Sequence, residues 1–267
     1  ISGGSASTVY RGHHWLSKKT KVAVKILKPE LVGTRADVKR FKREGALIDM
    51  LETPRLVSVL ARGEHAGTFY IVMEYLRGQT LAERMKAEPP IDRAATVRVL
   101  IQMAEALDEI HRHGIIHRDL KPSNIMLVED RGRTDAVKLL DFGVASGPVP
   151  EAEGETRFFS GTLAYIAPEQ TRNQETPAAD VYSLGMIAYE LFAGARPFKD
   201  CRSHELLEAI LHRSPAPVRT VAPGLSIRLA DVVMAMLVKD PADRPAVERI
   251  AAVLREEAFE FRSSPGA

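Results

Sequence analysis

Residues 116–127 read IHRDLKPSNIML, a run of polar residues enclosed by apolar ones. A surface loop is commonly polar because its backbone is solvated, and such a loop carries charges without a defined spacing. Here Asp119 lies two residues before Lys121 and five before Asn124, and DFG at 141–143 follows VKLL, which we expect to form an apolar strand. The spacing therefore indicates a loop with a chemical role.

The residue types in this loop suit phosphate chemistry. The oxygens of Asn124 and Asp141 are of the kind that Mg²⁺ prefers as ligands. A further carboxylate held off the metal, Asp119, can accept a hydroxyl proton, and Lys121 can hold a phosphate oxygen. Metal ligands, a base and a lysine together predict phosphoryl transfer.

The first part of the chain predicts a sheet that carries a buried cation. In KVAVKIL (21–27) and TFYIVMEY (68–75), successive side chains alternate between two faces, as in strands. Lys25 lies within the first of these strands, where a buried lysine is costly without a partner. Glu44 is the candidate partner, because it lies on a helix that we expect over 36–51.

The rest of the chain predicts helices. Apolar residues recur at helical spacing over 97–110, with Asp92 as a suitable N-cap and Gly114 as the end signal. The stretch VYSLGMIAYELFAG (181–194) is apolar nearly all round, which favours a buried helix. A strand-rich start followed by a helix-rich remainder predicts an α+β protein with two lobes.

Composition narrows the function classes. The 267 residues carry a net charge of +2, which gives no support for nucleic acid or a membrane as partner. Cys201 is the single cysteine, so no internal disulfide forms and a reducing compartment is expected. No apolar run is long enough to span a bilayer. His111 and His113 are expected at the surface.

Four motifs occur in a fixed order and carry a family resemblance. VAVK, HRDLKPSN, DFG and APE follow one another over essentially the whole chain, and the sequence resembles the catalytic domain of eukaryotic-type Ser/Thr protein kinases, in their bacterial branch. The resemblance implies a bilobal protein-kinase-like fold. An N-lobe with a small antiparallel sheet and one main helix is expected at 1–77, its start truncated. A larger, mostly helical C-lobe is expected at 78–262, with the catalytic loop, the activation segment and the substrate-binding surface.

The resemblance also implies roles for individual residues. Lys25 would hold the α- and β-phosphates of ATP and pair with Glu44, while Asp119 would act as catalytic base. Lys121 would steady the γ-phosphate, and Asn124 and Asp141 would hold magnesium. The residues implied around the nucleotide, besides Lys25, are Gly3, Gly4, Val9, Ala23, Glu74, Leu76 and Met126, with Met73 as gatekeeper.

Further positions resemble structural and regulatory residues of the family. Arg118 implies control by a phosphate on the activation loop, and Thr156 is the best-placed acceptor. Thr162, in SGT, resembles the residue that bonds Asp119 and Lys121. Asp180 resembles the aspartate that holds the catalytic loop. His117 is expected to pack rather than to transfer protons, and Glu169 and Arg244 resemble a buried ion pair.

The glycine loop departs from the family pattern. Its first and third glycines are replaced by Ser2 and Ser7. Because serine tolerates positive φ poorly, we expect weaker ATP affinity than a three-glycine loop gives.

These features predict a regulatory signalling kinase that uses ATP and Mg²⁺, with Mn²⁺ as an alternative. It would phosphorylate Ser and Thr of proteins, including its own activation loop. The resemblance further implies a cytoplasmic location, alone or as the cytosolic domain of a longer protein, and a homodimer through the N-lobe. Two rival interpretations stay open. One is a degenerate kinase fold that serves as a scaffold, and the other is a small-molecule kinase of related fold, such as those acting on antibiotics.

Overall fold

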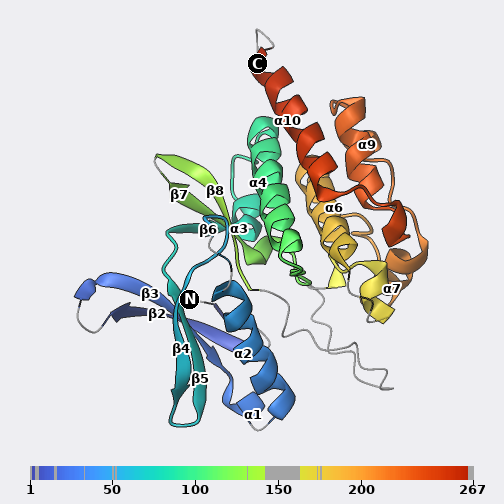
Figure 1. The fold of residues 1–267 in the computed structure, drawn as a ribbon. Coiled ribbons are helices and arrows are strands. Elements are labelled where there is room, and N and C mark those ends of the chain that lie inside the picture. The colour runs from blue at the N-terminus through green and yellow to red at the C-terminus, as the bar shows by residue number, and fades with distance from the viewer. Residues whose placement is uncertain are drawn as a thin grey trace.

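The structure is a computed structural model with two parts, a sheet-rich part with one long helix and a larger helical part (Figure 1). It describes residues 2–3, 6–14, 17–32, 34–49, 51, 53–130, 132–141, 163–172, 174 and 176–263. None of the helices over these residues is both long and apolar enough to cross a bilayer.

The sheet-rich part is the predicted N-lobe. In the described residues it has five antiparallel strands in the order β1-β2-β3-β5-β4, with one long helix, α2, beside them. The bounds are β1 (Ser2–Gly3), β2 (Ser7–His14), β3 (Ser17–Leu27), α1 (Pro29–Val32), α2 (Arg35–Asp49), β4 (Val59–His65) and β5 (Thr68–Glu74). The helix expected over 36–51 is thus confirmed, with ends shifted by one and two residues.

The predicted alternation decides which side chains of this sheet are buried. Phe69, Ile71 and Met73 of β5 are buried, while the residues between them are half-buried. On the neighbouring strand Lys25 is also buried, at 6% exposure, and it stands opposite Ile71 in the ladder. The sheet therefore places a cation inside an apolar layer, facing α2.

The predicted C-lobe is built on two helices, α4 and α6, with α10 packed along α4 (Figure 1). α4 begins after Asp92, whose side chain accepts a hydrogen bond from the Ala95 N–H, and ends just before Gly114 at φ +69°. The bounds are α3 (Leu81–Lys86), α4 (Arg93–Arg112), η3 (Pro168–Arg172), α6 (Pro177–Ala193), α7 (Ser203–His212), α8 (Val218–Val221), α9 (Ile227–Met236), η4 (Pro241–Asp243) and α10 (Val247–Ser263).

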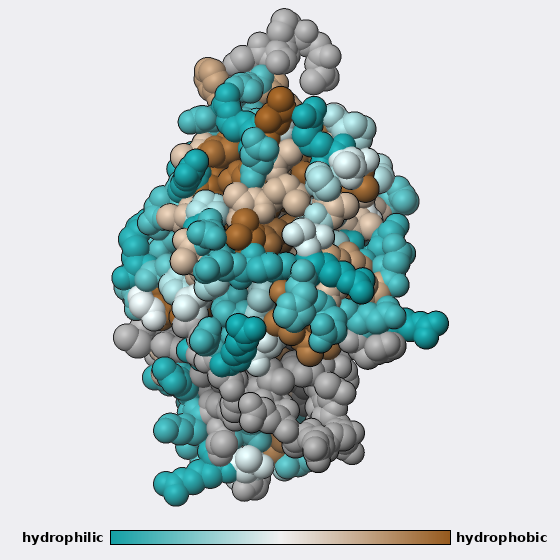
Figure 2. All heavy atoms as spheres, turned by 90° about the vertical axis from the view of Figure 1, so that its right-hand side faces the viewer, coloured by the Kyte–Doolittle hydropathy of each residue, from teal (hydrophilic) through white to brown (hydrophobic). Residues whose placement is uncertain are grey.

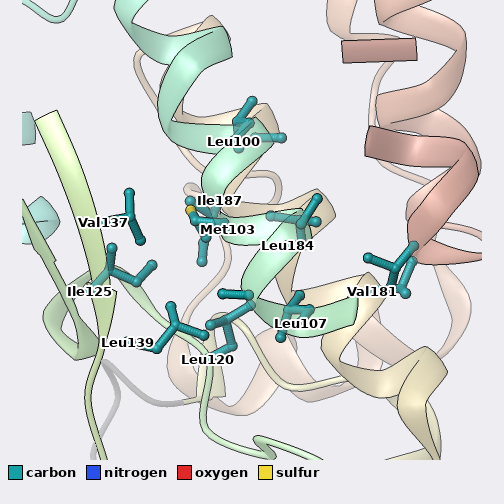
Figure 3. Packing of buried hydrophobic residues seen from close by; sticks show 14 of the residues in the cluster. Leu100, Met103, Leu107, Leu120, Ile125, Val137, Leu139, Val181, Leu184 and Ile187 are labelled. Atoms are coloured by element: carbon teal, nitrogen blue, oxygen red, sulfur yellow. The ribbon is translucent and has the colours of Figure 1, made fainter. Parts of the chain in front are cut away.

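α6 is the buried helix that the sequence predicts. Each residue over 179–189 is buried, so the helix is enclosed on all sides. Leu184 and Ile187 of α6 face Met103 of α4 in the apolar layer of Figure 3. Leu120 of the catalytic loop packs into the same apolar cluster, so this layer anchors the loop.

A small three-stranded sheet stands between the five-stranded sheet and the helices (Figure 1). Its strands are β6 (Gly78–Thr80), β7 (Ile125–Asp130) and β8 (Arg133–Leu139), in antiparallel order, with the short 3₁₀ helix η1 (Pro122–Asn124) before β7. Ile125 pairs with Leu139 at one end of the β7–β8 hairpin. Only β8 was expected from the sequence, so this sheet is a finding of the structure.

The strain expected from the serines at positions 2 and 7 is absent at these two described residues. Neither Ser2 nor Ser7 has a positive φ, and Ser7 lies in β2, where it pairs with Leu27. An extended strand residue needs no glycine. The expectation of weaker ATP affinity therefore loses its conformational basis at these two positions.

Candidate active site

The predicted base, lysine and asparagine form one cluster at the end of the catalytic loop. The Lys121 ammonium donates to both carboxylate oxygens of Asp119, at 2.9 and 2.8 Å. The Asn124 amide nitrogen donates to the Asp119 backbone oxygen at 2.8 Å and to its carboxylate at 3.0 Å. The 3₁₀ turn over Pro122–Asn124 brings Asn124 back onto Asp119. The carboxylate is thus held on two sides by side chains close to it in the sequence.

Lys25 joins the two lobes. Its ammonium lies 2.6 Å from a Glu44 carboxylate oxygen on α2 and 2.9 Å from a carboxylate oxygen of Asp141, which follows β8. The side chains of Lys25 and Glu44 are 7% and 2% exposed, whereas that of Asp141 is 37% exposed. The predicted Lys25–Glu44 pair is therefore confirmed, and the structure adds Asp141 as its third member.

Burial and neighbouring charges shift the pKa values of Lys25 and Glu44 in opposite directions. Burial lowers the pKa of Lys25, but the carboxylates of Asp141 and Glu44 more than reverse this, so its pKa lies above the ordinary value. Burial raises the pKa of the Glu44 carboxyl to about 7, although the Lys25 charge lowers it. The lysine therefore stays cationic at neutral pH and available to an anion.

Asp180 holds the catalytic loop from below. Its carboxylate, 1% exposed, accepts hydrogen bonds from the backbone N–H groups of His117 and Arg118 at 2.8 and 2.9 Å. Arg118 adopts φ +69°, a left-handed conformation that is costly for a side chain other than glycine. The predicted role of Asp180 is thus confirmed, and it supports a strained residue next to the base.

Two histidines lie next to the contacts of the Asp180 carboxylate. Nε2 of His111 lies 2.8 Å from the Asp180 carboxylate, and the His111 side chain is 12% exposed. The expectation of a surface position for His111 was wrong, because the end of α4 turns this residue toward α6. His117 is fully buried, and its Nε2–H donates to the Leu140 carbonyl at 3.0 Å. Burial lowers the pKa of His117, which fits the predicted packing role.

Gln170 is a contact that the sequence reasoning missed. Its amide nitrogen donates to the Arg118 carbonyl at 2.9 Å, and its amide oxygen accepts from the Ala167 N–H at 2.9 Å. The strained backbone of Arg118 is therefore held by Asp180 on one side and by Gln170 on the other. The position directly after the APE motif was the one signal for it.

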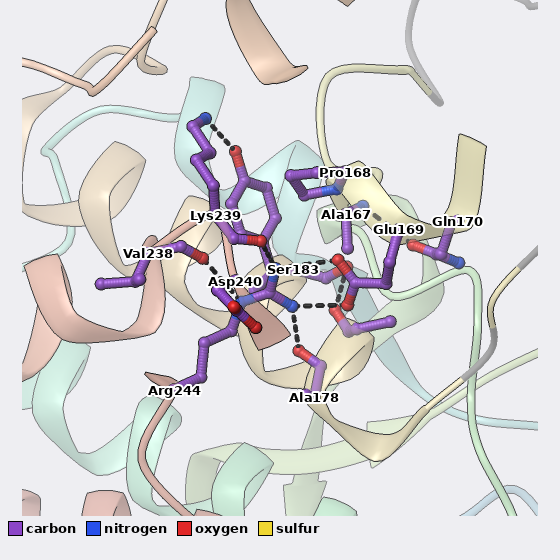
Figure 4. A network of polar contacts seen from close by, with 12 residues as sticks. Ala167, Pro168, Glu169, Gln170, Ala178, Ser183, Val238, Lys239, Asp240 and Arg244 are labelled. Carbon is purple, nitrogen blue, oxygen red and sulfur yellow. Dashed lines mark hydrogen bonds and ion pairs between the residues drawn. The ribbon is translucent and has the colours of Figure 1, made fainter. Parts of the chain in front are cut away.

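The predicted Glu169–Arg244 pair is confirmed as a buried bidentate contact (Figure 4). The guanidinium lies 2.6 and 2.8 Å from the two Glu169 oxygens and also donates to the carbonyls of Ala178, Val238 and Lys239. Its side chain is 0% exposed. One cation thus fixes η3 against the start of α6 and the turn after α9.

The donor set at the mouth of the loop fits a hard metal ion. The Asn124 amide nitrogen makes two hydrogen bonds to Asp119, so its amide oxygen faces the other way, and among the described residues this oxygen has no hydrogen bond. The half-exposed carboxylate of Asp141 supplies further oxygens. Carboxylate and amide oxygens of this kind suit Mg²⁺.

The candidates for nucleotide contacts lie on both sides of the lobe junction. Val9 and Ala23 lie on the neighbouring strands β2 and β3, while Met126 lies on β7 of the small sheet. Ala23 stands opposite Met73 in the β3–β5 ladder. Gly3 ends the edge strand β1.

The segment that links the lobes is fixed by a contact that sequence spacing did not reveal. The Glu74 carboxylate accepts a hydrogen bond from the Ser58 N–H at 2.9 Å and pairs with the Lys138 ammonium. Lys138 also donates to the Leu56 carbonyl at 3.0 Å. In the described part of the chain, Leu76 makes no hydrogen bond, so its backbone groups are available to a ligand.

Three predicted positions lie outside the residues that the structure describes. They are Gly4, Thr156 and Thr162.

Comparison with known proteins agrees with this geometry. A family model described as "Protein kinase domain" matches residues 1–254. The chain is 35% identical over 257 residues to the serine/threonine-protein kinase pkn3 of Myxococcus xanthus, which covers 92% of this chain and 46% of that protein. It is 36% identical over 230 residues to the serine/threonine-protein kinase PknB of Mycobacterium tuberculosis, covering 84% of this chain and 36% of that protein.

A solved structure extends the similarity to the fold. The crystal structure of a mutant PknI kinase domain from Mycobacterium tuberculosis superposes with a TM-score of 0.74 at 27% identity, over 97% of this chain and 93% of that one. The present chain spans less than half of the length of the two curated relatives named above. With the family match over nearly all of its residues and the catalytic cluster in place, the chain belongs to the protein kinase domain family.

Proposed function

We propose that this domain transfers the γ-phosphate of ATP to Ser and Thr hydroxyls of proteins. The observation that supports this most strongly is the double contact of Lys25. One ammonium pairs with Glu44 of the N-lobe helix and with Asp141 of the C-lobe at once, at 2.6 and 2.9 Å. The parts that phosphoryl transfer needs are therefore assembled rather than separated.

The chain's own groups supply positioning and charge. A lysine ammonium has three N–H donors, and two contacts at Lys25 leave a third for a phosphate oxygen. Asp119 would accept the proton of the attacking Ser or Thr hydroxyl, as a general base must. Lys121, now on the Asp119 carboxylate, would neutralise charge on the transferred phosphoryl group.

Asn124 and Asp141 are proposed to hold the metal, which we take to be Mg²⁺, with Mn²⁺ as an alternative. The metal, when bound, would offset the negative charge of the phosphate groups. The orientation of the Asn124 amide and the exposure of the Asp141 carboxylate support this assignment.

The nucleotide is proposed to lie between the lobes. The free backbone groups of Leu76 and the backbone of Glu74 would bind the adenine edge, with Val9 and Ala23 above the ring and Met126 below it. Gly3 and Gly4 would cover the phosphates with backbone N–H groups. Met126 stands opposite Lys138 in the β7–β8 ladder, and Lys138 pairs with Glu74 at the end of β5, which supports this arrangement.

Autophosphorylation on Thr156, with Arg118 as the phosphate partner, completes the proposal. Because ATP is its substrate, the domain is proposed to act in the cytoplasm, alone or within a longer protein. A homodimer through the N-lobe is also proposed. Leu60 is 56% exposed on β4, the edge of the sheet, which supports an interface there.

The test is incubation with Mg²⁺ and ATP, followed by intact mass measurement and phosphosite mapping, with Asp119→Asn as the matched control. We expect the unmutated protein to gain phosphate on Ser or Thr, and the control to gain none. Equal phosphate incorporation in both would refute the role of Asp119. If neither protein phosphorylates itself or a generic protein substrate while ATP binding persists, the scaffold interpretation is favoured instead.

A further inference from the structure

A groove of about 450 Å³ lies between α9 and α10, far along the C-lobe from the catalytic loop. Figure 2 faces this side of the molecule, where hydrophobic side chains emerge among hydrophilic ones over these helices. The groove is lined by Ser226, Ile227, Arg228, Asp231, Glu257 and Glu260. Three carboxylates and one guanidinium thus share one recess, so the groove is acidic.

Glu257 lies at a position of α10 where the spacing of the buried apolar residues predicts another apolar residue. On α10, Val247, Ile250 and Leu254 are buried at 5%, 0% and 1% exposure, and Glu257 continues the same stripe three residues later at 4%. A carboxylate at such a position is costly unless it is paired. Burial of the Glu257 carboxylate therefore destabilises the folded state, on the face of α10 that packs toward α9.

The Glu257 carboxylate lacks a partner in the described part of the chain. Its Oε2 atom is buried and makes no hydrogen bond, and neither of its oxygens takes part in an ion pair. The nearby Arg228 does not relieve it, because that guanidinium donates to Glu256 and Glu260 at 3.0 and 3.2 Å. Buried polar groups are nearly always satisfied, so an unsatisfied carboxylate that lines a groove points to an external donor.

The donor that fits is a guanidinium. Within the described residues, no group of three or more His, Cys, Asp or Glu side chains is arranged to hold a metal ion. An arginine side chain is planar, binds carboxylates with two donors and loses its hydration more readily than a lysine ammonium. Arg228 already pairs with carboxylates of α10, because one of its guanidinium nitrogens donates to both Glu256 and Glu260.

The rim of the groove adds an apolar contact. Ile227, the first residue of α9, is 64% exposed and lines the same recess. A partner segment with an apolar residue next to an arginine would contact both the acidic recess and the Ile227 side chain. We infer that the α9–α10 groove is a docking site for an arginine of a partner protein segment, held by Glu257 and Asp231 and flanked by an apolar residue on Ile227. This site lies outside the phosphoryl-transfer cleft and does not depend on the proposed activity.

The test uses a five-residue peptide with one arginine between two leucines, and a counterpart with citrulline, the neutral analogue of arginine. Titration calorimetry at low salt should show the arginine peptide binding roughly tenfold or more tightly than the citrulline peptide, because a charged hydrogen bond is lost. Equal affinities for the two peptides, or no binding of either, would overturn the inference.

Variants locate the site. Glu257→Gln should weaken binding of the arginine peptide by roughly tenfold. Glu256→Gln, one residue away and paired with Arg228 on the surface, should change it by less than about twofold. Both variants should keep the phosphorylation activity of the unmutated protein, so failure here is separable from failure of the proposed function. An equal loss of affinity in the two variants would contradict the assignment to Glu257.

A stability measurement checks the same residue independently. Glu257→Leu completes the apolar stripe of α10, so it should raise the midpoint of urea unfolding while abolishing peptide binding. A lower midpoint would show that the carboxylate supports the fold itself, and it would overturn the docking role.

Discussion

Arg244→Lys is the substitution whose effect follows most directly from the geometry, because it keeps the charge and changes the donors. The guanidinium makes five hydrogen bonds, two to Glu169 and one each to Ala178, Val238 and Lys239. A lysine ammonium has three donors, so at least two buried acceptors lose theirs. Each such acceptor costs about 1–3 kcal/mol, and the free energy of unfolding should therefore fall by about 2–6 kcal/mol.

Urea unfolding followed by far-ultraviolet circular dichroism measures this loss. The total stability of a domain is about 5–15 kcal/mol, so the expected loss is a large fraction of it and should clearly lower the unfolding midpoint. Arg228→Lys is the matched control, since Arg228 is 49% exposed and its ion pairs are on the surface. We expect the control to lose less than about 1 kcal/mol. A loss below about 1 kcal/mol for Arg244→Lys would refute the argument from donor geometry.

Three further substitutions address the active site and its surroundings. Asp180→Asn should lower kcat by about 10- to 100-fold with little change in the ATP KM, because the backbone of Arg118 relaxes and the base is misplaced; steady-state kinetics would contradict this if KM changed and kcat did not. His117 is kept neutral by burial, so between the ordinary pKa of about 6.5 and its lower folded pKa the unfolded chain binds more protons. The free energy of unfolding therefore keeps its full value above pH 6.5 and falls by up to about 1.4 kcal/mol per pH unit below it. Urea titrations at several pH values should show a smaller slope for His117→Gln. Lys138→Met removes the partner of Glu74, worth about 1 kcal/mol, so the ATP KM should rise about fivefold with kcat nearly constant; an unchanged KM would show that this contact does not position the nucleotide.

The parts of the fold that could be predicted are those written in local patterns. The alternation over 68–75, the cap at Asp92 and the apolar helix over 181–194 each depend on neighbours within a few residues, and each is confirmed. The small β6-β7-β8 sheet was largely missed, because β6 has only three residues and β8 packs against α4, which is distant from it in the sequence.

The site was predictable only where motifs carry it. Lys25, Glu44 and Asp180 were assigned from the family resemblance, and their contacts are confirmed. Gln170 and His111 were not, because each acts through a hydrogen bond to a residue at least 50 positions away. Sequence spacing contains no information on such pairs until the helices that bring them together have been placed.

The pairing of β7 with β8 fixes the distance between Asn124 and Asp141, the two proposed metal ligands. Asn124 directly precedes β7 and Asp141 follows β8 by two residues, and the Leu140 N–H donates to the Asn124 carbonyl at 2.8 Å. Their separation is therefore set by ladder pairing at the open end, whatever happens at the turn around Gly132. Insertions at that turn leave the spacing of Asn124 and Asp141 intact. The hairpin can therefore become longer during evolution without moving these two side chains relative to each other. A slip of one residue in the ladder would instead send every side chain of β8 to the opposite face.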